Sequence, residues 1–161
     1  MRPVTRVTAL LSATALIGLA IPASAQESSY PPISKREFVA GSIKVKVTGS
    51  FSIDEEVPIN TKASIGDGEM TWLQYGASGS DEPNALITFT TMGETGITVG
   101  RGKLITTGGI MPGEKSQCTG KAEVTAKQIS GRYTCKGISS YDPATSKMGK
   151  VDIEVNFTAK S

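Results

Sequence analysis

Apolar and polar residues alternate in two segments, one near each end of the chain. From 42 to 53 the sequence is SIKVKVTGSFSI, with Ile, Val and Phe confined to odd positions and Lys to even ones. From 151 to 159 the sequence VDIEVNFTA repeats this order, with the charged residues again at even positions. A period of two places one row of side chains in a core and the other in water. Both segments are therefore predicted to be half-buried β-strands.

The polar rows of these two segments carry opposite charges. Lys44 and Lys46 lie on the first, and Asp152 and Glu154 lie on the second. Opposite charges that face each other across antiparallel strands contribute about 0.2 to 1 kcal/mol per pair. We therefore expect the two terminal strands to be neighbours in one sheet.

Between them lie further runs rich in β-branched and aromatic residues, separated by segments rich in Gly, Asp, Ser and Pro. No window of ten residues keeps the apolar stripe of a helix. This spacing is typical of an all-β fold, and we expect an antiparallel β-sandwich, or a small barrel, of about 7–8 strands. The predicted intervening strands cover residues 70–76, 85–92, 97–107, 118–126 and 131–138.

The N-terminal segment predicts export. Residues 1–25 contain Arg2, Arg6, an apolar run and the triplet Ala23-Ser24-Ala25, the features of a bacterial secretory signal peptide. The run is shorter than the ~20 residues that a membrane span requires. We expect a secreted or periplasmic protein with no membrane span, an extended lead-in over 26–40 and a single β domain over 41–161.

Charge balance argues against nucleic acid as a partner. The chain has 17 Lys and Arg and 15 Asp and Glu, and the predicted signal peptide takes two of the basic residues, which leaves 15 of each sign. No local cluster of Lys and Arg is present to bind phosphates. We expect no nucleic-acid binding.

The only two cysteines, Cys118 and Cys135, share the apolar face of their predicted strands. In an exported protein a buried, even pair predicts a disulfide. Direct pairing in a hairpin would centre the turn on Ala126 and Lys127, whereas Ser130-Gly131 are better turn residues. The bridge could therefore instead cross between two sheets.

The chain contains no histidine, which removes Ser-His-Asp triads, Cys-His pairs and imidazole metal sites. Carboxylate groups occur at 54–56, at Asp67 with Glu69 and at 81–82, all in stretches that resemble solvated turns. We therefore expect no catalytic residue, no metal site and no cofactor, and a protein that is not an enzyme.

Three residues are candidates for a binding surface. The segment MTWLQY places Trp72 on one face of a strand and Leu73 with Tyr75 on the other, so at least one large aromatic side chain could lie outside the core. The segment VGRGK sets Arg101 between two glycines, where a bulge or tight turn would display it. The alternatives are structural: Trp72 as a core aromatic, and glycines that only bend a strand.

The C-terminal third of the chain contains a pattern made of Gly131 to Thr134, Gly137, Asp142-Pro143-Ala144, Lys150 and Ile153-Glu154-Val155. With this pattern it resembles the mycobacterial lipoprotein-antigen family. Faintly, Val47 to Ser50 also resembles an early strand of that family. The resemblance implies an exported β domain of the cell envelope that acts in surface contact and not as an enzyme. This chain lacks the lipidation cysteine of the family, its cysteines stand elsewhere, and no functional residue carries over.

We therefore expect a non-enzymatic protein that contacts an envelope component or an extracellular protein, with the oligomeric state left open. One alternative is a small β-barrel that carries an apolar ligand. Another is an inhibitor of secreted hydrolases that presents a loop such as 77–84 or 108–116. The inward Ile, Val and Phe residues are numerous enough to fill a core, which favours the first hypothesis over the carrier.

Overall fold

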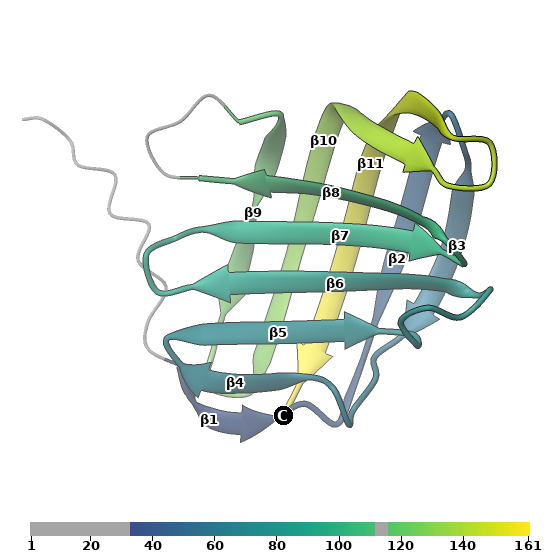
Figure 1. Ribbon diagram of the computed structural model, residues 1–161. Helices are drawn as coiled ribbons and strands as arrows, with labels where there is room; N and C mark the ends of the chain where they lie inside the picture. Colours follow the sequence, from purple (N-terminus) through teal and green to yellow (C-terminus); the bar gives the residue numbers. More distant parts are fainter. Residues whose placement is uncertain (1–32, 112–115) are drawn as a thin grey trace, which may run out of the picture.

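The computed structural model describes residues 33–111 and 116–161. They form one continuous antiparallel sheet of eleven strands, in the order β1-β4-β5-β6-β7-β8-β10-β11-β2-β3, with β9 paired to β10 (Figure 1). The expected all-β antiparallel class is confirmed. The expected count of 7–8 strands is wrong, and the sheet is neither a two-sheet sandwich nor a closed barrel but curls into a half-barrel.

The curl brings two sets of strands face to face, and they cross steeply in Figure 1. We call them the front layer and the back layer. The front layer contains β1 (Ile33–Glu37), β4 (Ile65–Gly68), β5 (Met70–Tyr75), β6 (Pro83–Thr90), β7 (Thr95–Arg101) and β8 (Leu104–Ile110). The back layer contains β2 (Ala40–Gly49), β3 (Ile53–Pro58), β9 (Cys118–Val124), β10 (Gln128–Asp142) and β11 (Lys147–Lys160).

Strand β10 joins the two layers because it changes partner along its length. Its first part pairs with β9, and after the irregularity between Cys135 and Ile138 its last residues pair with β8. Gly137 lies at this irregularity with a φ of 62°, a conformation that favours glycine. An extra residue in one strand bends it and increases its twist. The bulge at Gly137 is therefore the corner around which the sheet turns.

The core between the layers is closed by aromatic rings from both. Phe89 of the front layer lies 6.4 Å from Tyr133 and 5.8 Å from Phe157 of the back layer, measured between ring centroids. Tyr75 lies 6.5 Å from Phe157, and its hydroxyl donates to the Thr158 carbonyl at 3.0 Å. These side chains are essentially inaccessible to solvent. The centre of the half-barrel is thus filled with side chains.

Two predicted strands are each divided by a turn. The segment 42–53 forms β2 and the start of β3, with Val47 opposite Ile53. The segment 97–107 forms β7 and β8, which turn at Gly102, whose φ is 59°. Strands β1 and β4 were not predicted at all. Together, two divided strands and two missed ones account for the difference between seven predicted runs and eleven strands.

The second half of the predicted lead-in over 26–40 is part of the sheet. Within the predicted lead-in, Ile33–Glu37 forms β1 and pairs with β4, and Phe38 is fully buried. The Arg36 guanidinium donates to the carbonyls of Thr125 and Ala126 at 2.9 and 2.6 Å, and it lies 5.1 Å from the Phe38 ring. This segment therefore ties the edge of the front layer to the β9–β10 turn. The predicted signal peptide and the start of the lead-in lie outside the described residues.

The disulfide between Cys118 and Cys135 is confirmed. The two residues are direct partners in the β9–β10 hairpin, and the turn falls on Ala126 and Lys127. Thr125 stabilises this turn, since its hydroxyl accepts from the Gln128 amide at 3.0 Å. The alternative of a bridge between sheets is wrong, because the polar side chain of Thr125 supplies what the turn residues themselves lack.

The terminal strands are neighbours, as expected, with Glu154 opposite Lys46. The other predicted charge pairs do not face each other: Lys44 lies opposite Asn156, and Asp152 lies opposite Thr48. Asp152 instead turns to the bulge of β10. Its carboxylate accepts from the Gly137 amide at 2.8 Å and from the Lys136 ammonium at 3.0 Å.

These hydrogen bonds to the charged carboxylate hold the pKa of Asp152 below its usual value. The bond from the Gly137 amide has the larger effect, and the bond from Lys136 the next largest. A carboxylate whose pKa is lower in the folded state than in the unfolded state stabilises the fold at pH values above its unfolded pKa of about 4. This stabilisation is lost as the pH falls through the folded pKa. We expect Asp152→Asn to be less stable than the parent at pH 7, and the difference to shrink as pH is lowered below about 4. Urea unfolding of both proteins across pH 7 to 2.5 measures it, and a difference that stays constant would contradict the role of this carboxylate.

In the part of the chain that the structure describes, no helix has the length and apolar character needed to cross a membrane.

Candidate functional site

The structure does not bring the three predicted binding residues together. Trp72 lies half-buried on the outer face of β5, whereas Tyr75, on the opposite face, is a fully buried core residue. Arg101 is the last residue of β7, and its guanidinium is ion-paired with Glu55 of β3. Along the sheet Trp72 aligns with Gly96 of β7, which is about 16 Å from Arg101 at the usual rise per residue.

The placement of Tyr75 and Arg101 has a structural explanation. Tyr75 follows the alternation of β5, which turns Thr71, Leu73 and Tyr75 inward. Gly102 lies in the hairpin turn and Gly100 is paired with Ile105 within the sheet, and the Arg101 side chain is held against β3 instead of being displayed. Of the three candidates, Trp72 alone presents an aromatic surface outside the core.

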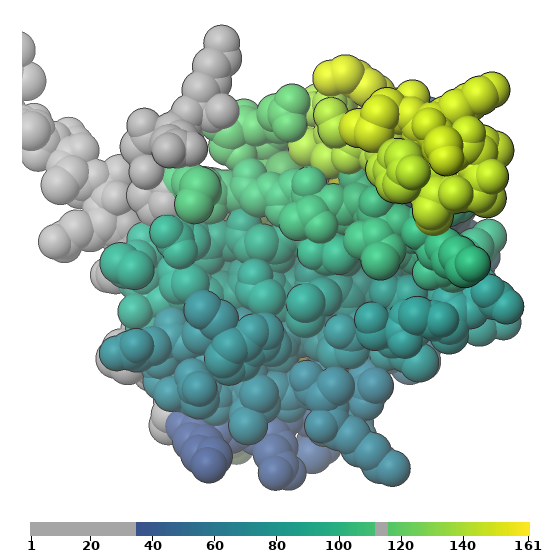
Figure 2. All heavy atoms as spheres, in the orientation of Figure 1, coloured from purple at the N-terminus to yellow at the C-terminus, as the bar shows by residue number. Residues whose placement is uncertain are grey.

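Trp72 belongs to a face that carries almost no charge. Across the four strands β5 to β8 Arg101 is the only charged residue, at the last position of β7. We define the uncharged face as the outward positions of these strands, and Figure 2 shows this side of the molecule as a broad surface without a deep hollow. Its residues are Met70, Trp72, Gln74, Asn84, Leu86, Thr88, Thr90, Gly96, Thr98, Gly100, Ile105, Thr107 and Gly109.

The strand register arranges these side chains in rows that run across the sheet. One row aligns Trp72, Thr88, Gly96 and Gly109, so the indole stands at one end and residues without a side chain at the other. A Cβ at position 96 would lie 2.4 Å from the Thr88 hydroxyl oxygen, so a larger residue there would require the Thr88 side chain to move. The neighbouring row contains Thr98 and Thr107, whose hydroxyl oxygens are 3.1 Å apart.

The rim of the uncharged face is charged again. Asp67 lies on β4, the strand next to β5, where its carboxylate accepts from the Met70 amide at 3.3 Å. Glu94 and Lys103 lie in the turns at the two ends of β7. An apolar side chain, Ile65, extends the face onto β4 opposite Trp72 and is 37% exposed.

The outer face of the back layer has the opposite character. Lys44, Lys46, Arg132 and Glu154 line a shallow groove there together with Asn156. Ion pairs cross this layer at 3.7 Å between Arg132 and Glu154 and at 3.0 Å between Lys136 and Asp152. Since both signs alternate along it, the face is a solvated surface of the kind that keeps a sheet soluble and specifies its register.

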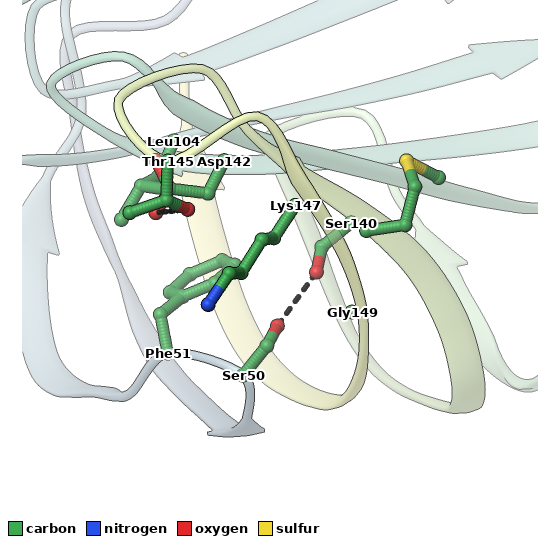
Figure 3. Close-up of a pocket in the computed structure, with 9 residues that line it drawn as sticks. Ser50, Phe51, Leu104, Ser140, Asp142, Thr145, Lys147 and Gly149 are labelled. Atoms are coloured by element: carbon green, nitrogen blue, oxygen red, sulfur yellow. Dashed lines mark hydrogen bonds between the residues drawn. The ribbon is translucent and has the colours of Figure 1, made fainter.

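A pocket of about 230 Å³ lies where the β10–β11 hairpin meets the β2–β3 turn (Figure 3). The hydroxyls of Ser50 and Ser140 are hydrogen bonded at 2.7 Å, and Gly149 permits their approach, because a Cβ there would lie 2.4 Å from that of Ser50. Lys147 forms part of the lining, but its ammonium makes no hydrogen bond to either hydroxyl in the described residues. The remaining lining residues are Phe51, Leu104, Asp142, Thr145 and Met148.

Of the predicted carboxylate groups, the one at 54–56 is part of the sheet. Asp54, Glu55 and Glu56 lie in β3 and not in a turn, and Glu56 accepts from the Ser42 hydroxyl at 2.6 Å. Among residues 33–111 and 116–161, no group of three or more Asp, Glu, Cys or His side chains is placed to hold a metal ion.

The sequence reasoning identified Trp72 but missed the face around it. The available signal was the absence of Asp, Glu, Lys and Arg from every outward position of four consecutive strands. In comparisons with known proteins no family model matches the chain, and no curated protein and no solved structure shows significant similarity to it. The proposed function therefore rests on the composition and geometry of the uncharged face.

Proposed function

We propose that this is an exported, non-enzymatic protein that binds an envelope component or an extracellular protein through the uncharged face. The observation that carries the proposal is the contrast between the two outer faces. The back layer has charged residues on every strand, whereas β5 to β8 have one, at a strand end.

Solvated sheet surfaces normally carry charged side chains, which also prevent sheets from associating. Charged residues are depleted at the centre of binding interfaces, because burying an unpaired charge is costly, while aromatic residues and Met are enriched there. Trp72, Met70 and the exposed Ile105 fit that composition. The resemblance of the C-terminal third to an envelope antigen family points in the same direction.

The two other hypotheses receive less support. A carrier requires interior space, but Tyr75, Phe89, Tyr133 and Phe157 occupy the centre between the layers. An inhibitor would present a loop. Both segments considered for that role are partly strand: 77–84 includes the start of β6, and 108–116 includes the end of β8. The segment 108–116 also includes residues outside the described part of the chain.

A matched pair of Thr→Lys variants tests the face. Thr98 lies on the uncharged face in the central strand β7, and Thr48 lies exposed on β2 in the back layer. We expect Thr98→Lys to weaken binding to the envelope fraction of the producing cells by about tenfold or more, since the new ammonium would be desolvated without a partner. Thr48→Lys should bind like the parent. Co-sedimentation with that fraction measures the affinity, and thermal unfolding of each variant confirms that both fold.

Equal losses in the two variants would show that the uncharged face has no special role. Failure of the parent protein to bind any envelope component or secreted protein of its host would refute the proposed function itself.

A further inference from the structure

We infer that the partner of the uncharged face is a neutral polysaccharide, a chain of uncharged sugars laid across strands β5 to β8. This inference rests on the proposed function and adds the chemical class of the ligand. It follows from three properties of the face: its lack of charge, its hydroxyl content and the position of its one large aromatic ring.

The lack of charge excludes ionic polymers as the favoured occupant. Polyanions such as nucleic acids or acidic glycans are held by several Lys or Arg side chains, and membrane surfaces by basic residues beside apolar anchors. The outward positions of β5 to β8 hold neither Lys nor Arg, since Arg101, at the end of β7, has the inward parity of that strand and is paired with Glu55. An uncharged ligand fits this face best, because neither the protein nor the ligand would then bury an unpaired charge in the complex.

The hydroxyl and amide groups distinguish a sugar from an apolar protein surface. Thr88, Thr90, Thr98 and Thr107 all point outward, together with Asn84. A protein interface of ordinary stability is built on several clustered aromatic or Arg anchors. Here the described strands provide one large aromatic ring among many small groups that both donate and accept hydrogen bonds, which suits a ligand rich in hydroxyl groups.

The row that begins at Trp72 gives the ligand a direction. Trp72, Thr88, Gly96 and Gly109 are aligned across four strands, and Thr98 and Thr107 lie in the next row. Neighbouring strands are about 4.8 Å apart, close to the length of one sugar ring along an extended chain. A polysaccharide that stacks one ring on the indole would pass over the small residues of this row, with the hydroxyls of the next row beside it.

The test uses the envelope fraction of the producing cells and a set of immobilised polymers. One portion of the fraction is oxidised with periodate, which cleaves the carbon–carbon bond between sugar carbons that carry adjacent hydroxyls, and another is digested with protease. We expect periodate to abolish co-sedimentation and protease to leave it unchanged. The purified protein should also bind at least one immobilised neutral glucan, mannan, galactan or arabinan, should not bind polygalacturonate, and should bind equally in 0.1 and 1 M salt.

Variants of Trp72 connect the binding to the row. Trp72→Ala should weaken glycan binding by at least about tenfold, as truncation of a central aromatic anchor does. Trp72→Phe should retain most of the affinity, because it keeps a ring for stacking. Phe51→Ala, which removes a partly buried aromatic side chain from the loop between β2 and β3, is the matched control and should bind like the parent.

The outcomes separate the inference from the function on which it rests. If protease abolishes envelope binding, periodate does not and no neutral polymer is bound, the partner is a protein, so the inference fails and the proposed function stands. Binding to polygalacturonate, binding that disappears at 1 M salt, or equal losses for Trp72→Ala and Phe51→Ala would also overturn the inference. If neither the envelope nor any polymer is bound, the proposed function and the inference fail together.

Discussion

Replacing Phe157 by Ala is expected to lower the free energy of unfolding by about 3–5 kcal/mol, the usual range for removing a large aromatic side chain from a core. Phe157 is about 1% exposed, and its ring lies 6.5, 5.8 and 6.0 Å from the rings of Tyr75, Phe89 and Tyr133. Two of these partners, Tyr75 and Phe89, belong to the front layer. The variant would therefore lose contacts within the back layer and between the two layers.

Urea unfolding at neutral pH measures the effect, with Phe51→Ala as the matched control. Phe51 follows β2 at the rim of the core and is only partly buried, so the same substitution should cost clearly less. Loss of stability should also lower the affinity of the uncharged face, because the inner side of β5 and β6 packs on this ring cluster. If Phe157→Ala is no more destabilising than Phe51→Ala, the aromatic cluster does not hold the layers together.

The strands at the two ends of the chain could be predicted because one face of each is buried and the other is charged. The same pattern hid the turn between β2 and β3. Val47 pairs with Ile53, and both have odd numbers, so the apolar parity continues through the turn as if one strand ran on. The hairpin can be recognised only from Gly49, whose φ is 126°, and from the loop that follows it.

Strand β1 could not be predicted from its own residues. The segment ISKRE has no alternation, and it is held by pairing with β4 and by the bonds from Arg36 to the β9–β10 turn, about 90 residues away in sequence. Such long-range contacts override a weak local preference. The half-barrel also depends on a long-range feature. The bulge at Gly137 bends the sheet between the part of β10 that pairs with β9 and the part that pairs with β8, and the local sequence does not show that both strands pair with β10.

The candidate site was only partly predictable for a similar reason. The alternation of β5 placed Trp72 opposite Leu73 and Tyr75, and the structure shows that Trp72 is the one on the outer side. A face, however, combines residues from four strands, and its rows depend on the order and register of those strands. The lack of charge is visible in each strand alone, but only the assembled sheet shows that these outward positions adjoin.

Removal of the disulfide is the second change with a large expected effect. We expect Cys118→Ala/Cys135→Ala to lose about 3 kcal/mol of stability, because the bond closes a loop with a sequence separation of 17 residues and so restricts the unfolded chain. Both sulfur atoms lie beneath β8: a Cβ at Gly108 would be 2.8 Å from the Cys118 sulfur and 3.2 Å from that of Cys135. The bond therefore supports the edge strand of the uncharged face from inside as well as joining β9 to β10.

Comparison with the reduced parent protein separates these two contributions in urea unfolding. The reduced parent keeps both sulfur atoms under Gly108, so it should lose only the stability that comes from closing the loop. The double Ala variant should lose somewhat more stability, because the space of the two sulfur atoms is left unfilled. At temperatures where both remain folded, each should still bind its partner, since the outward residues of β5 to β8 are unchanged. Unfolding midpoints equal to that of the oxidised parent would show that the β9–β10 register and the support of β8 are maintained by the strand pairing alone, without the covalent bond.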